Sequence, residues 1–76
     1  MEKFSIRLKE ISDVQEFAKI ATAMPYSIDL HSGRYIVDGK SIMGIFSLDF
    51  TQKIDVVAHT EDASALKSAT ARFIVD

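Results

Sequence analysis

Apolar and polar residues alternate along three stretches of this chain, which is the pattern of half-buried β-strands. In residues 3–9, Phe4, Ile6 and Leu8 fall on one side of such a strand and polar residues on the other. Residues 54–59 alternate in the same way. Each of these stretches therefore predicts a strand with one face against a core.

The third alternating stretch, residues 26–31, is followed by Ser32-Gly33, which we interpret as the two-residue turn of a hairpin. With that turn, Leu30 lies opposite Tyr35, and the apolar residues of the two strands share one face. The pattern thus predicts two further strands, joined directly to each other.

Two longer helices are predicted from apolar residues at helical spacing. Ser12 and Gln15 have the spacing of a reciprocal capping box at the start of the first helix, and Pro25 ends it. The other helix lies near the C-terminus, where Thr60 or Asp62 is the expected N-cap. Its apolar stripe comprises Ala63, Leu66, Thr70, Phe73 and Ile74.

A short, strongly apolar helix is predicted between these two. Ser41 stands where its hydroxyl can accept a hydrogen bond from a backbone N–H at the helix start. A phosphate on that hydroxyl is also well placed, since free N–H groups and the positive end of the helix dipole converge there. More apolar residues follow than one buried stripe can hold. They are Ile42, Met43, Ile45, Phe46 and Leu48.

The predicted element order is β-α-β-β-α-β-α. At 76 residues, the chain has room for a single domain, residues 1–76, with one core. We expect an α+β fold with a four-stranded antiparallel sheet, helices on one face, and the other face open to water. The predicted inward side chains are Phe4, Ile6, Leu8, Phe17, Ala21, Ile28, Leu30, Tyr35, Val37, Ile54, Val56, Leu66 and Phe73.

Composition argues against several classes of function. Nine basic and eleven acidic residues give a net charge of −2, whereas a nucleic-acid binder needs a basic face. Because the chain has no cysteine and only two, widely separated histidines, neither a disulfide nor a zinc site is expected. No apolar run approaches the ~20 residues of a membrane span, and the first residues are not a signal peptide. We expect a cytoplasmic protein without cofactor, metal, membrane or nucleic-acid partner.

The element order, together with Lys40-Ser41-Ile42-Met43-Gly44 at the start of the middle helix, resembles the histidine-containing phosphocarrier protein (HPr) family of the bacterial sugar phosphotransferase system. In element order the resemblance covers nearly the whole chain, while in sequence it is sharp only from about Gly39 to Leu48. It implies an open-faced sandwich of a four-stranded antiparallel sheet and three helices.

The resemblance also implies roles for individual residues. Ser41 corresponds to the serine that a regulatory ATP-dependent kinase phosphorylates in the family. Ile42 and Met43 correspond to the family's docking surface for phosphotransferase enzymes and for a transcriptional regulator. We add Lys40 and Phe46 to this predicted partner-binding set.

The resemblance fails at the start of the first helix. In the family, a histidine followed by an arginine and a proline opens this helix, and it carries phosphate received from phosphoenolpyruvate through an upstream enzyme. Residues 9–14 contain none of these three residue types, and Glu10 or Ile11 falls about where the histidine should be. A carboxylate does not simply replace it, because Glu10 repels incoming phosphate and an acyl phosphate is a different leaving group. We therefore leave histidine-based phosphate transfer out of the implied function.

Each candidate residue also has a purely structural interpretation. Ser41 as a plain N-cap contributes about 1 kcal/mol to stability without being modified. For Phe46 a core position is favoured, because aromatic side chains dominate small cores, and for Met43 an exposed docking position is favoured. His31 and His59 are expected on the open face of the sheet, as ordinary solvated residues.

Three functional hypotheses follow. The leading one is an HPr-like, non-enzymatic regulatory or interaction protein, switched at Ser41 by an HPr kinase, with phosphotransferase-system proteins or a transcriptional regulator as partners. The second is a phosphocarrier in the sugar phosphotransferase relay that uses an unusual acceptor, such as His31 or His59. The third is a small sheet module for dimerisation or ligand binding. For the first two we expect a monomer, and for the third a weak dimer is the alternative.

Overall fold

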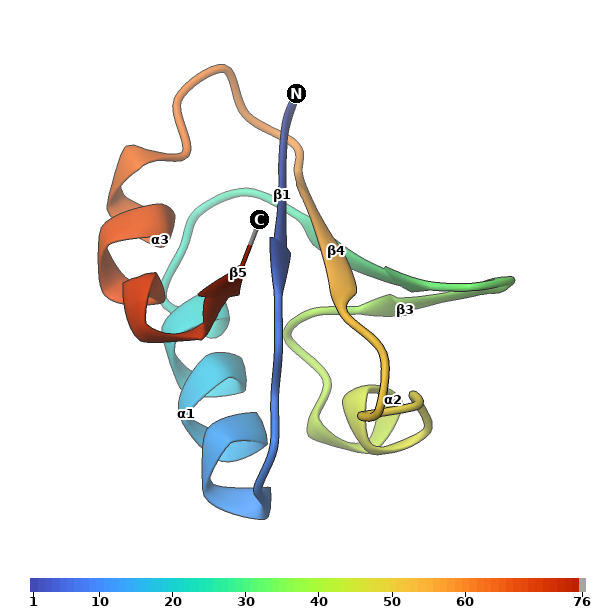
Figure 1. Cartoon of the computed structure of the whole chain (residues 1–76). Helices are drawn as coiled ribbons and strands as arrows, with labels where there is room; N and C mark the ends of the chain where they lie inside the picture. The colour runs from blue at the N-terminus through green and yellow to red at the C-terminus, as the bar shows by residue number, and fades with distance from the viewer. Residues whose placement is uncertain (76) are drawn as a thin grey trace.

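The computed structural model describes residues 1–75 as an antiparallel sheet of five strands with helices on one face (Figure 1). The α+β class and the one-sided helical layer confirm the prediction. The elements are β1 (Glu2–Ile6), α1 (Ile11–Thr22), β2 (Ile28–Ser32), β3 (Tyr35–Asp38), α2 (Ile42–Phe46), β4 (Ile54–Ala58), α3 (Ser64–Ala69), a 3₁₀ turn (Ala71–Phe73) and β5 (Ile74–Val75).

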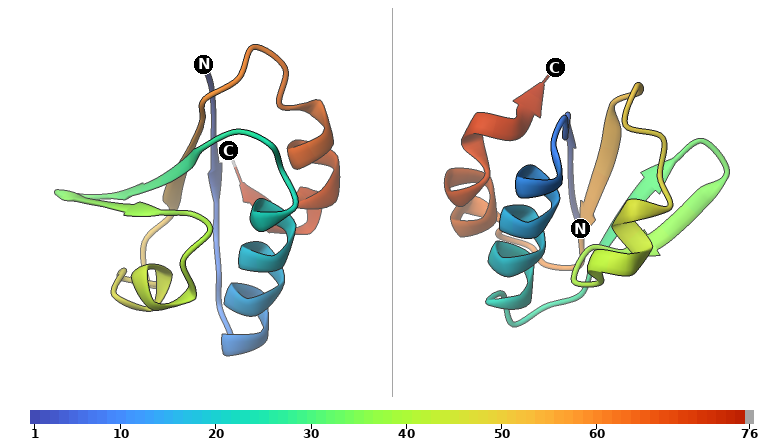
Figure 2. Two further views of the ribbon diagram at one scale, coloured as in Figure 1. Left: turned by 180° about the vertical axis from the view of Figure 1, so that it is seen from behind. Right: turned by 90° about the horizontal axis from the view of Figure 1, so that it is seen from below.

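The strand order in the sheet is β3-β2-β4-β1-β5. Strand β4 lies between β2 and β1, so segments far apart in the sequence form the centre of the sheet. The views in Figure 2 show α1 and α3 side by side, with α2 near the sheet end where the chain leaves β3. This arrangement leaves the opposite face of the sheet without a covering helix.

The fifth strand corrects the expected count of four, and Ile74 belongs to it instead of to the last helix. Helix α3 ends at Ala69, after which the Thr70 hydroxyl donates to the Leu66 carbonyl at 2.7 Å. The chain then pairs with the free edge of β1, where Ile74 lies opposite Ile6. Backbone groups at this edge need partners, and the strand supplies them. Helical periodicity alone does not reveal that requirement.

The hairpin turn lies one residue later than predicted, at Gly33-Arg34. Gly33 has a φ of 59°, and among residues 1–75 no non-glycine residue has a positive φ. Glycine at the first central position is the pattern of a type II′ turn, and a serine there would be strained. Leu30 therefore lies opposite Val37, and Ser32 opposite Tyr35.

Tyr35 is consequently a wrong core assignment. Tyr35 and its strand partner Ser32 lie on the helix-covered face of the sheet, but at the tip of a hairpin that extends beyond the helices (Figure 1). Tyr35 is 68% exposed. The alternation identified the face correctly and could not show where the covering layer ends.

The helix caps also differ from the predicted ones. Helix α1 starts at Ile11, with Glu10 as the N-cap and Asp13 as its capping-box partner, so the predicted Ser12 and Gln15 box is wrong. Helix α3 starts at Ser64, two residues after Asp62, whose carboxylate accepts from the Ser64 N–H at 2.9 Å. The N-cap there is Ala63, so neither Thr60 nor Asp62 holds that position.

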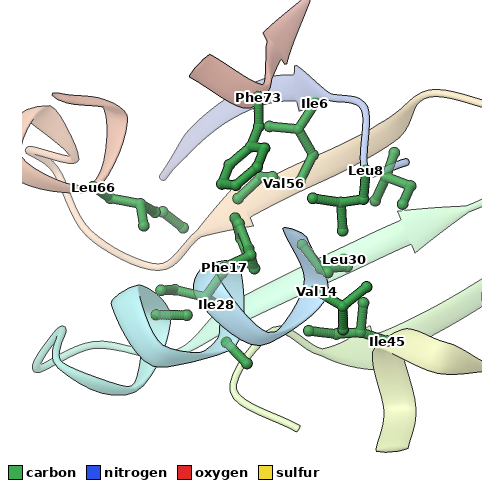
Figure 3. Close-up of a cluster of buried hydrophobic side chains, with 14 of the residues drawn as sticks. Ile6, Leu8, Val14, Phe17, Ile28, Leu30, Ile45, Val56, Leu66 and Phe73 are labelled. Carbon is green, nitrogen blue, oxygen red and sulfur yellow. The ribbon is translucent and has the colours of Figure 1, made fainter. Parts of the chain in front are cut away.

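The core is a single cluster between the sheet and the helices. Figure 3 shows side chains from α1, α3 and the strands converging, with Phe17 near its centre. Most of the predicted inward residues are buried, while Phe4 and Val37 are only partly so. Ile45 and Leu48, from the α2 segment, complete the cluster. No helix within residues 1–75 is both long enough and apolar enough to span a membrane.

Candidate functional site

The loop before α2 fixes the start of that helix through a close approach of two backbones. The Gly39 N–H donates to the Ile28 carbonyl at 2.7 Å. A Cβ at position 39 would lie 2.8 Å from the Ile28 Cγ2 atom, so only glycine fits without a shift. The Lys40 N–H donates to the Asp38 carboxylate at 2.8 Å, which tightens the turn further.

Ser41 is the N-cap of α2, as its position in the sequence predicted. Its backbone is extended, and its Oγ accepts from the Gly44 N–H at 3.1 Å. Ser41 is half-buried. Gly44 has no side chain beside this hydroxyl, and a Cβ there would approach Oγ to 3.3 Å. A side chain at position 44 would therefore crowd the serine oxygen.

We define the α2 patch as Ile42, Met43 and Phe46. These side chains are exposed by 42%, 82% and 40%. Ile45, on the same helix, is fully buried and anchors α2 to the core. The expectation that Phe46 is a core residue is wrong, because the short helix has one inward-facing position and Ile45 takes it. A five-residue helix thus presents three large apolar side chains to solvent.

Lys40 precedes Ser41 but is directed toward α1. Its Nζ donates to the Met24 carbonyl at 2.9 Å, just beyond the C-terminal end of that helix. A cation is favourable there because helix C-terminal carbonyls carry partial negative charge. In this conformation Lys40 joins α1 to the loop before α2, and its contact with a partner stays a prediction.

The start of α1 is occupied by carboxylates, where the resemblance places a histidine. The Asp13 carboxylate accepts from the N–H groups of Lys9 and Glu10 at 3.0 and 3.2 Å. The pKa of Asp13 is held below its usual range, chiefly by the hydrogen bond from the Lys9 N–H. The bond from the Glu10 N–H and the nearby Arg72 guanidinium lower it as well. Ile11 follows the N-cap and is 65% exposed. Neither histidine of the chain lies here.

The two histidines lie on or just after strands of the sheet and not at the start of α1. His31 is on β2, opposite Asp55 of β4, and His59 follows β4. His59 Nε2 lies 2.7 Å from the Asp29 carboxylate, an exposed pair. Within residues 1–75 no three histidine or acidic side chains are grouped so that they could hold a metal ion.

A hollow that the sequence did not indicate lies between the hairpin tip and the turn after α2. Its volume is about 570 Å³, and Tyr35, Ser47 and Asp49 are among its lining residues. The Thr51 hydroxyl and N–H both donate to Asp49, and these bonds lower the pKa of that carboxyl. The hollow adjoins the C-terminal end of α2, because Ser47 is its C-cap.

Comparison with known proteins identifies the fold as that of HPr. No family model matches the chain, and no curated protein matches its sequence. Solved structures do match it. HPr-C-His from Thermoanaerobacter tengcongensis has a TM-score of 0.79 and 24% identity, with 95% of this chain and 89% of that chain covered.

Two further structures agree. A histidine-containing phosphocarrier protein described in connection with the divergence of Mycoplasma from Gram-positive bacteria has a TM-score of 0.76 at 20% identity, over 93% of this chain and 89% of that chain. The phosphocarrier protein HPr from Bacillus anthracis has a TM-score of 0.73 at 24% identity, over 95% of this chain and 93% of that chain. At these identities the likeness establishes the fold. The fold class predicted from the sequence is therefore confirmed.

Proposed function

We propose that this chain is an HPr-like, non-enzymatic interaction protein related to the phosphotransferase system, with the α2 patch as its docking surface. The observation that carries the proposal is the exposure of Ile42, Met43 and Phe46 on one short helix. Isolated exposed apolar residues are ordinary, but adjacent ones of this size are typical of binding surfaces. The structural neighbours named as phosphocarrier proteins support a role in the same system.

Phosphorylation at Ser41 is the proposed switch. The Ser41 oxygen accepts one backbone hydrogen bond and lies directly before Ile42 and Met43. A phosphate there would add about −1.5 to −2 charges beside an apolar surface. A partner that buries Ile42 and Met43 would have to desolvate that charge, whereas a partner with an arginine cluster would gain from it. The modification would thereby select between partners.

The direct test is incubation with an HPr kinase and ATP, followed by mass spectrometry. We expect one added phosphate on the wild-type chain and none on Ser41→Ala. Ser47→Ala is the control, since Ser47 is an exposed serine at the other end of α2. An unmodified wild-type chain, or a Ser41→Ala chain that is still modified, would contradict the switch.

Docking is tested separately by NMR titration with the upstream enzyme of the phosphotransferase system. We expect Met43→Ser to weaken binding at least about tenfold, as anchor residues of interfaces do. Tyr35→Ser is the control, because Tyr35 is also strongly exposed but belongs to the hairpin tip. Equal affinities for the two variants would place the docking surface elsewhere.

The second candidate function is phosphate transfer through an unusual acceptor, which the likeness to phosphocarrier structures favours. Incubation with phosphoenolpyruvate and the upstream enzyme would then give an acid-labile phosphate. An unchanged mass would exclude this candidate. Sedimentation at several concentrations tests the third hypothesis, because a sheet module that dimerises would show a concentration-dependent mass.

A further inference from the structure

A second cavity, lined by none of the α2 patch residues, lies where the chain leaves β1. Its volume is about 440 Å³, within the range of roughly 300–1,000 Å³ typical of small-molecule sites. Four segments contribute to it: the residues after β1, the first turn of α1, the 3₁₀ turn and β5. The lining residues are Arg7, Lys9, Asp13, Arg72, Phe73 and Val75.

The charges around this cavity are not balanced. Arg72 is satisfied, because it donates to Glu16 at 2.8 Å and to Asp13 at 3.4 Å. Arg7 and Lys9 are different: within residues 1–75 neither side chain forms a salt bridge. Among the described residues, the lining thus has three cations and one carboxylate, on a chain whose net charge is −2.

Arg7 also has a buried donor without an acceptor. Its Nε atom is inaccessible to solvent and has no hydrogen-bond partner among the described residues. Leaving a buried charged donor unpaired is costly, since the group has lost its water and gained nothing in exchange. The backbone N–H of Arg7 donates to the Phe73 carbonyl at 2.9 Å, so the residue is fixed in this position.

The remaining wall of the cavity is apolar. Phe73 is almost fully buried, with its ring directed into the core beside Ile6 (Figure 3). Val75 is half-buried on β5. We propose that the cavity binds a small organic anion, whose carboxylate or phosphate group accepts from Arg7 and is attracted by Lys9, and whose carbon body contacts Val75. Charge-assisted hydrogen bonds from a guanidinium to such groups are among the stronger polar contacts in proteins.

This site is independent of the proposed Ser41 switch, and its test does not involve the α2 patch. The test is an NMR titration of the full chain at low ionic strength with four probes: acetate, butyrate, inorganic phosphate and phenyl phosphate. We expect saturable shifts at residues 7–9 and 73–75, larger for the probes with a carbon body. The headgroup that binds more tightly identifies the anion as carboxylate or phosphate.

Charge-matched variants decide whether the cavity is the site. Arg7→Gln should raise the Kd at least about tenfold, which corresponds to the loss of a charge-assisted hydrogen bond. Arg34→Gln removes the same charge at the hairpin tip and should leave the Kd unchanged. If Arg7→Gln does not fold, Lys9→Gln is compared with Lys19→Gln, which lies in the last turn of α1. Absence of saturable shifts with all four probes, or equal Kd values for the paired variants, would overturn the proposal.

Discussion

At the scale of single residues, the position of α2 depends on one contact. Gly39 packs so closely against Ile28 that a Cβ would lie 2.8 Å from its Cγ2 and 3.2 Å from its carbonyl oxygen. The second of these atoms belongs to the backbone of β2 and cannot move aside as a flexible side chain could. The start of the candidate site is therefore coupled to the sheet through a residue that has no side chain.

Gly39→Ala should accordingly destabilise the protein by about 1–3 kcal/mol, the usual cost of overpacking a tight contact. The free energy of unfolding in urea measures the effect. Gly44→Ala is the comparison, because its Cβ would lie no closer than 3.3 Å to the Ser41 Oγ atom and 3.4 Å to the Val37 Cβ atom, and alanine favours the helix. A Gly39→Ala variant as stable as Gly44→Ala would contradict this account of the loop.

Asp13 predicts a pH dependence of stability. Its pKa in the folded state lies below the usual value of 3.8, chiefly because the Lys9 N–H donates to it. A lowered folded-state pKa contributes stability that is fully present above the unfolded-state pKa and is lost as pH falls through the folded one. The wild-type chain should therefore be more stable than Asp13→Asn at pH 6, and this difference should shrink below about pH 4.

Chemical denaturation of both chains at pH 6, 4 and 3 checks this prediction. Asp49→Asn serves as a comparison, since the pKa of Asp49 is also lowered, in this case by bonds from Thr51 that lie within a surface turn. A stability difference between Asp13→Asn and wild type that is constant with pH would show that Asp13 acts by packing and not through its charge.

At the scale of helices and strands, the sequence could predict that a residue is able to cap a helix. It could not predict which of several neighbouring residues takes the capping position. The N-cap role of Ser41 follows from its position before an apolar run, and the structure confirms it. Ser12 and Gln15 offered an equally good capping pattern for α1, yet Glu10 and Asp13 form the box. Two overlapping boxes lie within six residues, and sequence spacing does not rank them.

The turn of the β2–β3 hairpin and the conformation of the C-terminal segment were predicted wrongly for other reasons than the helix caps. Ser32-Gly33 and Gly33-Arg34 are both two-residue turns around one glycine, and the pairing of Ser32 with Tyr35 distinguishes them. The residues of β5 continue the apolar spacing of the preceding helix, and their strand conformation arises from the free edge of β1. The α2 patch could be predicted only in part, because the exposure of Phe46 depends on which α2 residue faces the core.

The N-cap of α2 leads to a prediction about the stability that a single capping residue contributes. Ser41→Ala should lower the free energy of unfolding by about 0.5–2 kcal/mol, because the Gly44 N–H loses its acceptor. Ser41→Asn retains a capping side chain and should remain close to wild type. Urea unfolding of the three chains measures the difference. Equal stability of the alanine and asparagine variants would show that the hydroxyl contributes no capping energy.

At the scale of the whole molecule, the order of the strands sets where the fold is strongest. Because β4 pairs on both sides, the centre of the sheet joins residues from the first, middle and last thirds of the chain. The topology was predictable as a class, since strands and helices alternate in a recognisable order. The order of the strands in the sheet was not predicted, because an alternating pattern shows which side chains share a face of the sheet but not which strands are neighbours. The α2 patch and the hairpin both lie toward the side of the sheet occupied by β3.

This order predicts a gradient of local stability that amide hydrogen exchange can measure. Ile54, Val56 and Ala58 of β4 are fully buried, whereas three of the four residues of β3 are exposed and the strand is paired on one side only. Hydrogen-bonded amides of β4 should open only in global unfolding, and those of β3 by local opening. We expect β3 to exchange at least about tenfold faster, equivalent to about 1.4 kcal/mol less protection. Equal protection would mean that the sheet opens as one unit, and the hairpin would then be as rigid as the core strands.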